Sequence, residues 1–230
     1  MTVFGFSTAP AGGDFLPIVK YDARAGRLFR VDRVETANGF ASDAIDITST
    51  FKAIVDFENV ESGWINFPAG SAPSFVLVPM GTPLPDKPSA NHKNGIRFML
   101  KLSKESGGAK PVRELSGTSK VFLSGVEAAY LAYKAEKDAN PGKLPVLTLE
   151  KTTPITTGQG DKRSTNYQPI FKISGWAPRG DLTFQPKGGS AQPAQPAAAA
   201  GNAAPSTGST RVEAPKAAQP ETTAAEDDFG

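Results

Sequence analysis

Cationic and aromatic side chains recur near the ends of the strands that this sequence predicts, and they are the residues best suited to chemistry. Single-stranded nucleic acids are bound by cations that follow the phosphates and by exposed rings on which the bases stack. Core packing is the alternative for each ring. Positions three apart on a regular strand face opposite sides, so at most one of Arg27 and Arg30 joins a given face. We predict that the nucleic-acid contacts come from Lys20, Arg27, Arg30, Trp64, Arg97, Lys101, Lys162, Arg163 and Tyr167.

The set of reactive groups is too small to predict an enzyme. The chain has no cysteine and one histidine, His92, which we expect on the surface of a loop, so the common zinc ligand sets cannot form. Asp56 and Glu61 belong to an acidic group without calcium-loop spacing, and we expect them on solvated strand faces. The segment TTGQGDKRST (156–165) lacks the spacing of a phosphate loop. We therefore predict a non-catalytic protein with no metal and no cofactor.

Most of the chain before residue 187 consists of short apolar runs punctuated by Gly and Pro, which is typical of strands. In the clearest run (95–102), apolar residues alternate with Arg97, Met99 and Lys101, so we expect a half-buried strand that shows both cations to solvent. Polar loops are predicted over 81–95 and 152–166. Strands are predicted within 15–21, 26–34, 45–60, 63–67, 74–80, 95–102, 144–151 and 167–176.

One segment has the period of a helix. Phe122, Val126, Ala129 and Tyr133 recur at steps of three and four, and Asn-Pro-Gly follows, so we predict a helix over 119–138. A helix before the last two strands matches the OB-fold, whose ligand face lies on its second and third strands and in two loops. We predict a mainly β fold, an OB-like Greek-key barrel with one helix before the last two strands. An immunoglobulin-like sandwich is the alternative, and the length of the helix counts against it.

The segment after residue 187 has almost nothing to bury. Ala, Pro, Gly, Ser and Thr dominate it, and Val212 and Phe229 are its large apolar residues, so it cannot offset the entropy cost of ordering. We predict a nucleic-acid-binding domain over 1–187, a disordered linker over 188–220 and an acidic tip over 221–230. The formal net charge of +2 combines a basic body with an acidic tail, which fits a polyanionic partner. A soluble protein with a solvating tail is the alternative, and charge alone favours it.

The tip AEDDFG (225–230) resembles the acidic, phenylalanine-containing tips of phage and bacterial single-stranded-DNA-binding proteins, although Gly230 follows the ring here. The resemblance implies sequence-tolerant binding of single-stranded DNA in replication and recombination. It also implies that the tip recruits replication or recombination proteins and can compete with DNA. The residues that match the family's tip are Glu226, Asp227, Asp228 and Phe229. A phage structural or assembly protein with a β-sandwich body and a solubilising tail is the second hypothesis.

Nothing in the sequence predicts a membrane protein. The first residues lack the charged and continuous apolar regions of a signal peptide, and no apolar run approaches about eighteen residues. The lack of cysteine fits a reducing compartment. We therefore expect a protein of the bacterial host's cytoplasm without membrane contacts, and a homo-oligomer is an open alternative.

Overall fold

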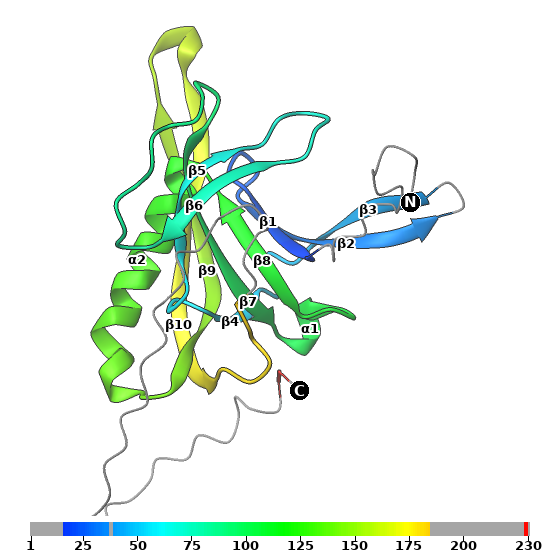
Figure 1. Cartoon of the computed structure of the whole chain (residues 1–230), viewed down its shortest axis with the longest axis vertical. Coiled ribbons are helices and arrows are strands. Elements are labelled where there is room, and N and C mark those ends of the chain that lie inside the picture. The colour runs from blue at the N-terminus through cyan, green and yellow to red at the C-terminus, as the bar shows by residue number, and fades with distance from the viewer. Residues whose placement is uncertain (1–15, 37–38, 185–227, 230) are drawn as a thin grey trace, which may run out of the picture.

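A strongly curved sheet with one long helix against it forms the body of the protein (Figure 1). This computed structural model describes residues 16–36, 39–184 and 228–229. The helices are α1 (Lys104–Gly107), α2 (Lys120–Glu136) and the single-turn η1 (Lys137–Ala139) and η2 (Gly160–Lys162). The strands are β1 (Ile18–Asp22), β2 (Arg27–Thr36), β3 (Gly39–Asp46), β4 (Lys52–Val55), β5 (Glu61–Asn66), β6 (Ser74–Pro79), β7 (Lys93–Leu102), β8 (Val112–Gly117), β9 (Lys143–Thr157) and β10 (Ser164–Pro178).

All ten described strands belong to one hydrogen-bonded sheet, whereas a β-sandwich has two. The order is β10-β9-β4-β7-β8-β1-β2-β3, and β5 pairs with β7 and with β6 at the side. β1 and β8 are parallel, and the other pairs are antiparallel. The sheet does not close, but the turn after β1 reaches β10, where the Tyr167 N–H donates to the Ala23 carbonyl at 2.7 Å. The mainly β fold is therefore confirmed.

The main core lies between the inner face of the sheet and α2. Phe98 and Leu100 of β7 and Phe122 and Val126 of α2 are all at most 5% exposed, so the predicted helical period marks the buried side of the helix. Gly125 allows α2 to lie directly on β10, because a Cβ at this position would overlap the Pro169 carbonyl oxygen. The predicted helix is confirmed, with its last residues in the 3-10 turn η1.

The outer face of the same strands is also covered. Ile54, Met99 and Val146 lie on this side, in a second apolar cluster that includes Leu182 from the segment after β10. Leu182 is fully buried. Because both faces of β4 and β7 are covered, the alternation along β7 does not produce one dry face and one wet face.

The secondary structure differs from the prediction in several places, and most of β3 was not predicted. Residues 152–166 form a hairpin and not a loop, since β9 and β10 pair from Pro178 and Lys143 out to Ser164 and Thr157. Residues 45–60 split between the end of β3 and β4, and the Asp46 carboxylate accepts the Thr48 N–H in the intervening turn at 2.9 Å. β8 was not predicted, because Arg113 and Glu114 interrupt its apolar pattern, yet both are buried.

Candidate nucleic-acid interface

A cleft opens at the end of the body where the β9–β10 hairpin projects, at the top of Figure 1. It consists of two adjoining hollows of about 770 and 580 Å³, which share Thr118, Ser119 and Asn166. Its walls come from the turn after β1, the β5–β6 hairpin, the β6–β7 loop, the first turn of α2 and the β9–β10 hairpin. Segments that are far apart in the sequence therefore build one concave surface.

The lining of this cleft is cationic. Its carboxylate, from Asp22, is already engaged, since it accepts the backbone N–H groups of Arg24 and Ala25 at 2.9 and 3.1 Å. The cations carry no such partner: among the residues that the structure describes, none of them forms an ion pair. These charges are therefore available to an anionic ligand. The lining cations are Lys20, Arg24, Lys87, Lys93 and Lys120.

Two aromatic rings stand among the cations. The Trp64 indole N–H donates to the Pro85 carbonyl at 2.7 Å, and the Lys87 ammonium lies 5.6 Å from the centre of the ring. Phe67 is 48% exposed and packs edge-on against Phe75, with 6.0 Å between the ring centres. Phe67 is therefore exposed in the smaller hollow, whereas Trp64 lines the larger hollow and is partly covered by Lys87.

Tyr21 and Tyr167 hold the floor of the cleft together. The Tyr21 hydroxyl donates to the Tyr167 carbonyl at 2.7 Å. Burial, followed by the charge of Asp22, raises the pKa of Tyr21 to about 12, so the hydroxyl remains a donor at neutral pH. Gly26 has a φ of +66°, and a Cβ there would lie 2.9 Å from the Tyr167 Cβ. Tyr167 therefore docks β10 on the β1–β2 turn and is only partly exposed.

The structure brings some of the predicted residues together. Lys20 and Trp64 line the cleft. Lys162 and Arg163 are exposed at the end of the β9–β10 hairpin, whose Ile155 forms part of the wall. Sequence reasoning missed Lys87, Lys93 and Lys120, since only the strand order shows that a loop, the start of β7 and the start of α2 meet at one end of the sheet.

The prediction that Arg97 and Lys101 face solvent is wrong. Arg97 is 0% exposed, with its guanidinium 2.6 Å from Glu61, 2.9 Å from Glu114 and 5.5 Å from the Phe184 ring centre. Lys101 is 8% exposed, and its ammonium is 2.9 Å from Asp181. Both lie on the outer face of β7, as the alternation indicates, but the segment after β10 crosses that face. Neither side chain can reach a nucleic acid in this fold.

Arg27 and Arg30 are also engaged elsewhere. Arg27 pairs with Asp46 at 2.5 Å, although its side chain remains 59% exposed. Arg30 pairs with Asp32 at 3.0 Å and donates to the Ser106 carbonyl at 3.0 Å. The same Asp32 accepts from Arg113 at 2.6 Å. Arg30 therefore belongs to an ionic cluster around α1 and does not line the cleft.

Several groups expected at the surface are buried. Asp56 is 0% exposed and accepts two hydrogen bonds from Arg179, at 2.6 and 2.9 Å, which with Glu58 raise the pKa of Arg179. Glu61 is 8% exposed. His92 is 7% exposed and lies 2.8 Å from the Ser89 hydroxyl and 3.2 Å from the Ser74 hydroxyl. His92 ties the β6–β7 loop to β6, and the acids are held by arginines far away in the sequence.

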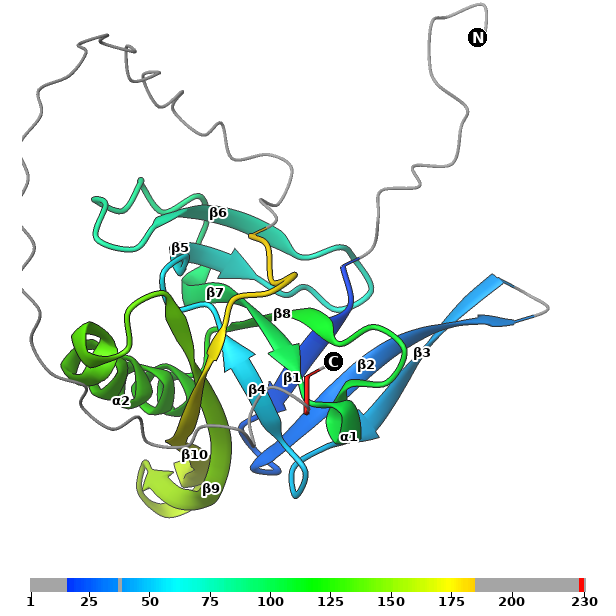
Figure 2. The ribbon, with the colours of Figure 1, turned by 90° about the horizontal axis from the view of Figure 1, so that it is seen from below.

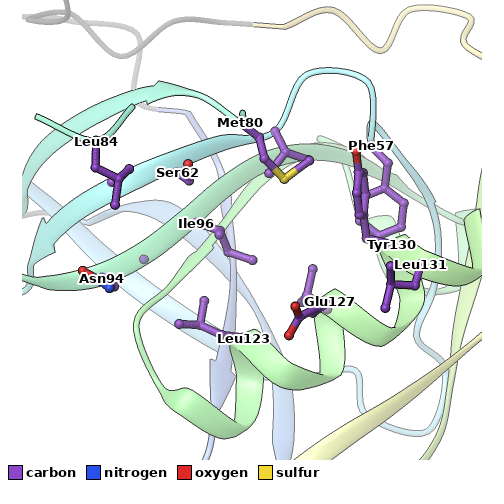
Figure 3. Close-up of a pocket in the computed structure, with 14 residues that line it drawn as sticks. Phe57, Ser62, Met80, Leu84, Asn94, Ile96, Leu123, Glu127, Tyr130 and Leu131 are labelled. Atoms are coloured by element: carbon purple, nitrogen blue, oxygen red, sulfur yellow. The ribbon is translucent and has the colours of Figure 1, made fainter. Parts of the chain in front are cut away.

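A further pocket of about 430 Å³, which shares Asn94 and Leu123 with the larger hollow, lies between α2 and the β5–β7 region (Figure 3). Leu123, Glu127 and Leu131 of α2 face Met80 and Leu84 across it in the figure. Its lining is apolar, and its one charged group is a carboxylate. This pocket is therefore unsuited to phosphates, in contrast to the cationic cleft.

Of the predicted partner-binding residues, Glu226 and Asp227 lie outside the described residues. Asp228 and Phe229 lie against the body beside β4 and α1, at the end opposite the β9–β10 hairpin (Figures 1 and 2). Phe229 is only 7% exposed. In this structure the ring is therefore buried by its own chain.

No protein-family model, curated protein or solved structure matches this chain. Among the described residues, no helix has the length and apolarity that crossing a membrane requires. The function is therefore inferred from the geometry of the cleft.

Proposed function

We propose that the protein binds single-stranded DNA through this cleft, in replication or recombination, without sequence preference and without catalysis. The cleft's cations, none of them ion-paired within the described residues, and the nearby rings Trp64 and Phe67 carry the proposal. Cations can follow the phosphates, and a ring accepts any base on its face. The lining suits binding and not catalysis, because its carboxylate and its histidine already have hydrogen-bond partners. Asp22 accepts backbone N–H groups of the turn after β1, and His92 lies within hydrogen-bond distance of two serine hydroxyls.

The connections between the strands support the same proposal. With β4 as the first strand, β7 and β8 follow as the second and third, and α2 precedes β9 and β10. β4 pairs with both β7 and β9, as the first strand of an OB barrel does. We infer an open OB-like barrel in which β1 takes the place beside β8, the turn after β1 contacts β10, and β2 and β3 extend the sheet.

In this assignment the cleft lies where an OB-fold holds its ligand. That ligand face lies on the second and third strands and in the loops that join the first pair and the last pair of strands. Here these are the cleft ends of β7 and β8, the connection from β4 to β7 and the β9–β10 hairpin. Lys93, Ser116 and Thr157 belong to these parts, and all three line the cleft.

The acidic tip is the second part of the proposal. Glu226, Asp227, Asp228 and Phe229 resemble a tip that recruits replication or recombination proteins, with the ring entering an apolar pocket of the partner. A lone large ring in a polar segment suits this role, because buried aromatic anchors dominate the energy of many interfaces.

A titration of the full chain against a labelled oligo-dT strand tests the proposal. Single-strand affinity falls with salt by about 0.7 log units per log unit for each phosphate contacted, so about four contacts give a slope near −3. Unlabelled duplex should compete poorly. Salt-independent binding, or equal competition by duplex and single strand, contradicts the proposal.

A further inference from the structure

The outer face of the sheet carries an apolar pocket that is filled by residues remote in the sequence. Ile54, Met99, Leu144 and Val146 form its base, and all four are at most 3% exposed. Ala177, near the end of β10, and Leu182, from the segment after β10, belong to the same cluster. Phe229 completes the cluster and is 7% exposed. One phenyl ring from the tip therefore occupies a site built by the body.

Polar contacts fix the residue before the ring. The Lys52 ammonium lies 2.7 Å from the Asp228 carboxylate and 5.8 Å from the centre of the Phe229 ring. The Lys104 N–H donates to the Asp228 carbonyl at 2.9 Å. The pocket thus contacts the side chain and the backbone carbonyl of Asp228 and the ring of Phe229, which are consecutive residues.

The pocket is separate from the cationic cleft. Figure 2 shows residues 228–229 beside β4 and α1, and Figure 1 places them at the end of the body away from the β9–β10 hairpin. No residue that lines the cleft belongs to the apolar cluster around Phe229. The docked tip therefore leaves the cleft open.

We propose that this pocket is a reversible binding site for an Asp–Phe peptide and that the chain's own tip is its ligand. The contact is small enough to open, since the Lys52 and Asp228 side chains remain 35% and 33% exposed, and exposed ion pairs contribute little. Residues 185–227 connect the tip covalently to the body. Binding of the tip to its pocket is therefore intramolecular, and the high effective concentration favours the docked form. This consequence rests on the proposed function, in which the tip recruits partner proteins. The docked form buries the Phe229 ring, so a docked tip cannot bind a partner protein at the same time.

Thiol pairs test where the tip docks, because the natural chain has no cysteine. Full-length protein with Lys104→Cys and Asp228→Cys places two thiols on backbones that already meet, with 2.9 Å between the Lys104 nitrogen and the Asp228 carbonyl oxygen, and it keeps the ring. Mild oxidation should give an intramolecular disulfide, and adding Phe229→Ala should slow it by about tenfold or more, because burying a phenyl ring favours the docked form by at least that factor.

The matched control places the second thiol in the cleft, as Lys20→Cys with Asp228→Cys. It should oxidise about tenfold more slowly than the pair at positions 104 and 228. Equal rates for the two pairs, or a covalent dimer as the main product, would overturn the proposal. Neither result bears on DNA binding, so the two proposals fail separately.

Methyl resonances of methionine report the contact without cysteines. Met99 shares the cluster with Phe229, whereas Met80 is 40% exposed in the separate apolar pocket. Phe229→Ala should shift the Met99 methyl resonance and leave that of Met80 unchanged. Adding the free peptide AAEDDFG to this variant should restore the shift, and AAEDDAG should not. An unmoved Met99 resonance, or equal effects of both peptides, would refute the site.

Discussion

Two cations of β7, Lys93 and Arg97, differ in their burial and in their ionic partners. Lys93, the first residue of β7, is exposed at the cleft, and four residues later Arg97 is completely buried between two carboxylates. Both side chains carry a positive charge. The difference lies in what packs over each side chain. The segment after β10 crosses the outer face of the sheet at Arg97, whereas no part of the described chain covers Lys93 at the cleft.

The comparison teaches that a cation's role depends on its partners more than on its place in a pattern. Loss of a buried arginine with two acidic partners destabilises the fold, because two buried carboxylates then lack its positive charge. A lysine at a cleft with no acidic partner adds little to the fold and remains free to bind an anion. Substitutions should therefore separate stability from binding along a single strand.

The largest expected effect is on stability. Arg97→Met removes the partner of Glu61 and Glu114, and it should lower the free energy of unfolding by about 3–5 kcal/mol. Urea titration followed by circular dichroism measures the change. Lys93→Met is the control on the same strand and should change stability by less than about 0.5 kcal/mol. Equal losses for the two variants would show that the comparison is wrong.

Next come the rings of the cleft. Phe67→Ala and Trp64→Ala should each weaken oligo-dT binding by about 1–3 kcal/mol. Phe67 is half-exposed, so its variant should keep its melting temperature. Leu131→Ala removes another exposed apolar side chain, 60% exposed and outside the cleft, and should leave affinity unchanged. If the Phe67 variant binds normally, bases do not stack on that ring.

A smaller effect is expected from the charges that frame the cleft. Lys93→Glu combined with Lys120→Glu should weaken single-strand binding by about 1–2 kcal/mol at low salt, because each reversal replaces an attraction to a phosphate by a repulsion. The loss should shrink as salt screens the charges. Lys134→Glu with Lys137→Glu makes the same charge change on exposed residues at the far end of α2. Similar losses in both double variants would point to net charge and not to the cleft.

The smallest effect concerns pH. The pKa of Tyr21 is raised to about 12 in the fold, so the folded chain holds this proton more tightly than the unfolded chain. Its contribution is complete below pH 10 and is lost as the pH rises through about 12. Tyr21→Phe should therefore flatten the fall in melting temperature between pH 10 and pH 12. An unchanged fall would show that Tyr21 does not carry the alkaline transition.

Local patterns in the sequence predicted the parts of the fold that local forces determine. The helix period of Phe122, Val126 and Ala129 marks the buried face of α2, and Phe98 and Leu100 of the predicted strand over 95–102 lie in the core. The alternation in β7 gave the correct faces. It could not reveal the buried state of Arg97, because the cover comes from residues beyond position 178, remote in the sequence.

The candidate site was predictable only in part for a related reason. Lys20 and Trp64 could be chosen from residue type and turn context. Lys87, Lys93 and Lys120 could not, because a proline-rich loop, a strand start and a helix start converge only when β7 pairs with β5 and β8. The docked Phe229 was equally hidden, because its pocket combines four strands and the segment that follows β10.

The salt dependence of single-strand binding tests the cleft most directly. Replacing Lys20, Lys93 and Lys120 together by Gln should remove three phosphate contacts and flatten the log–log slope by about 2, with the melting temperature nearly unchanged. The matched variant replaces the exposed Lys110, Lys134 and Lys137 by Gln and should keep the full slope. A slope that flattens equally in both variants, or in neither, would contradict binding of single-stranded DNA in this cleft.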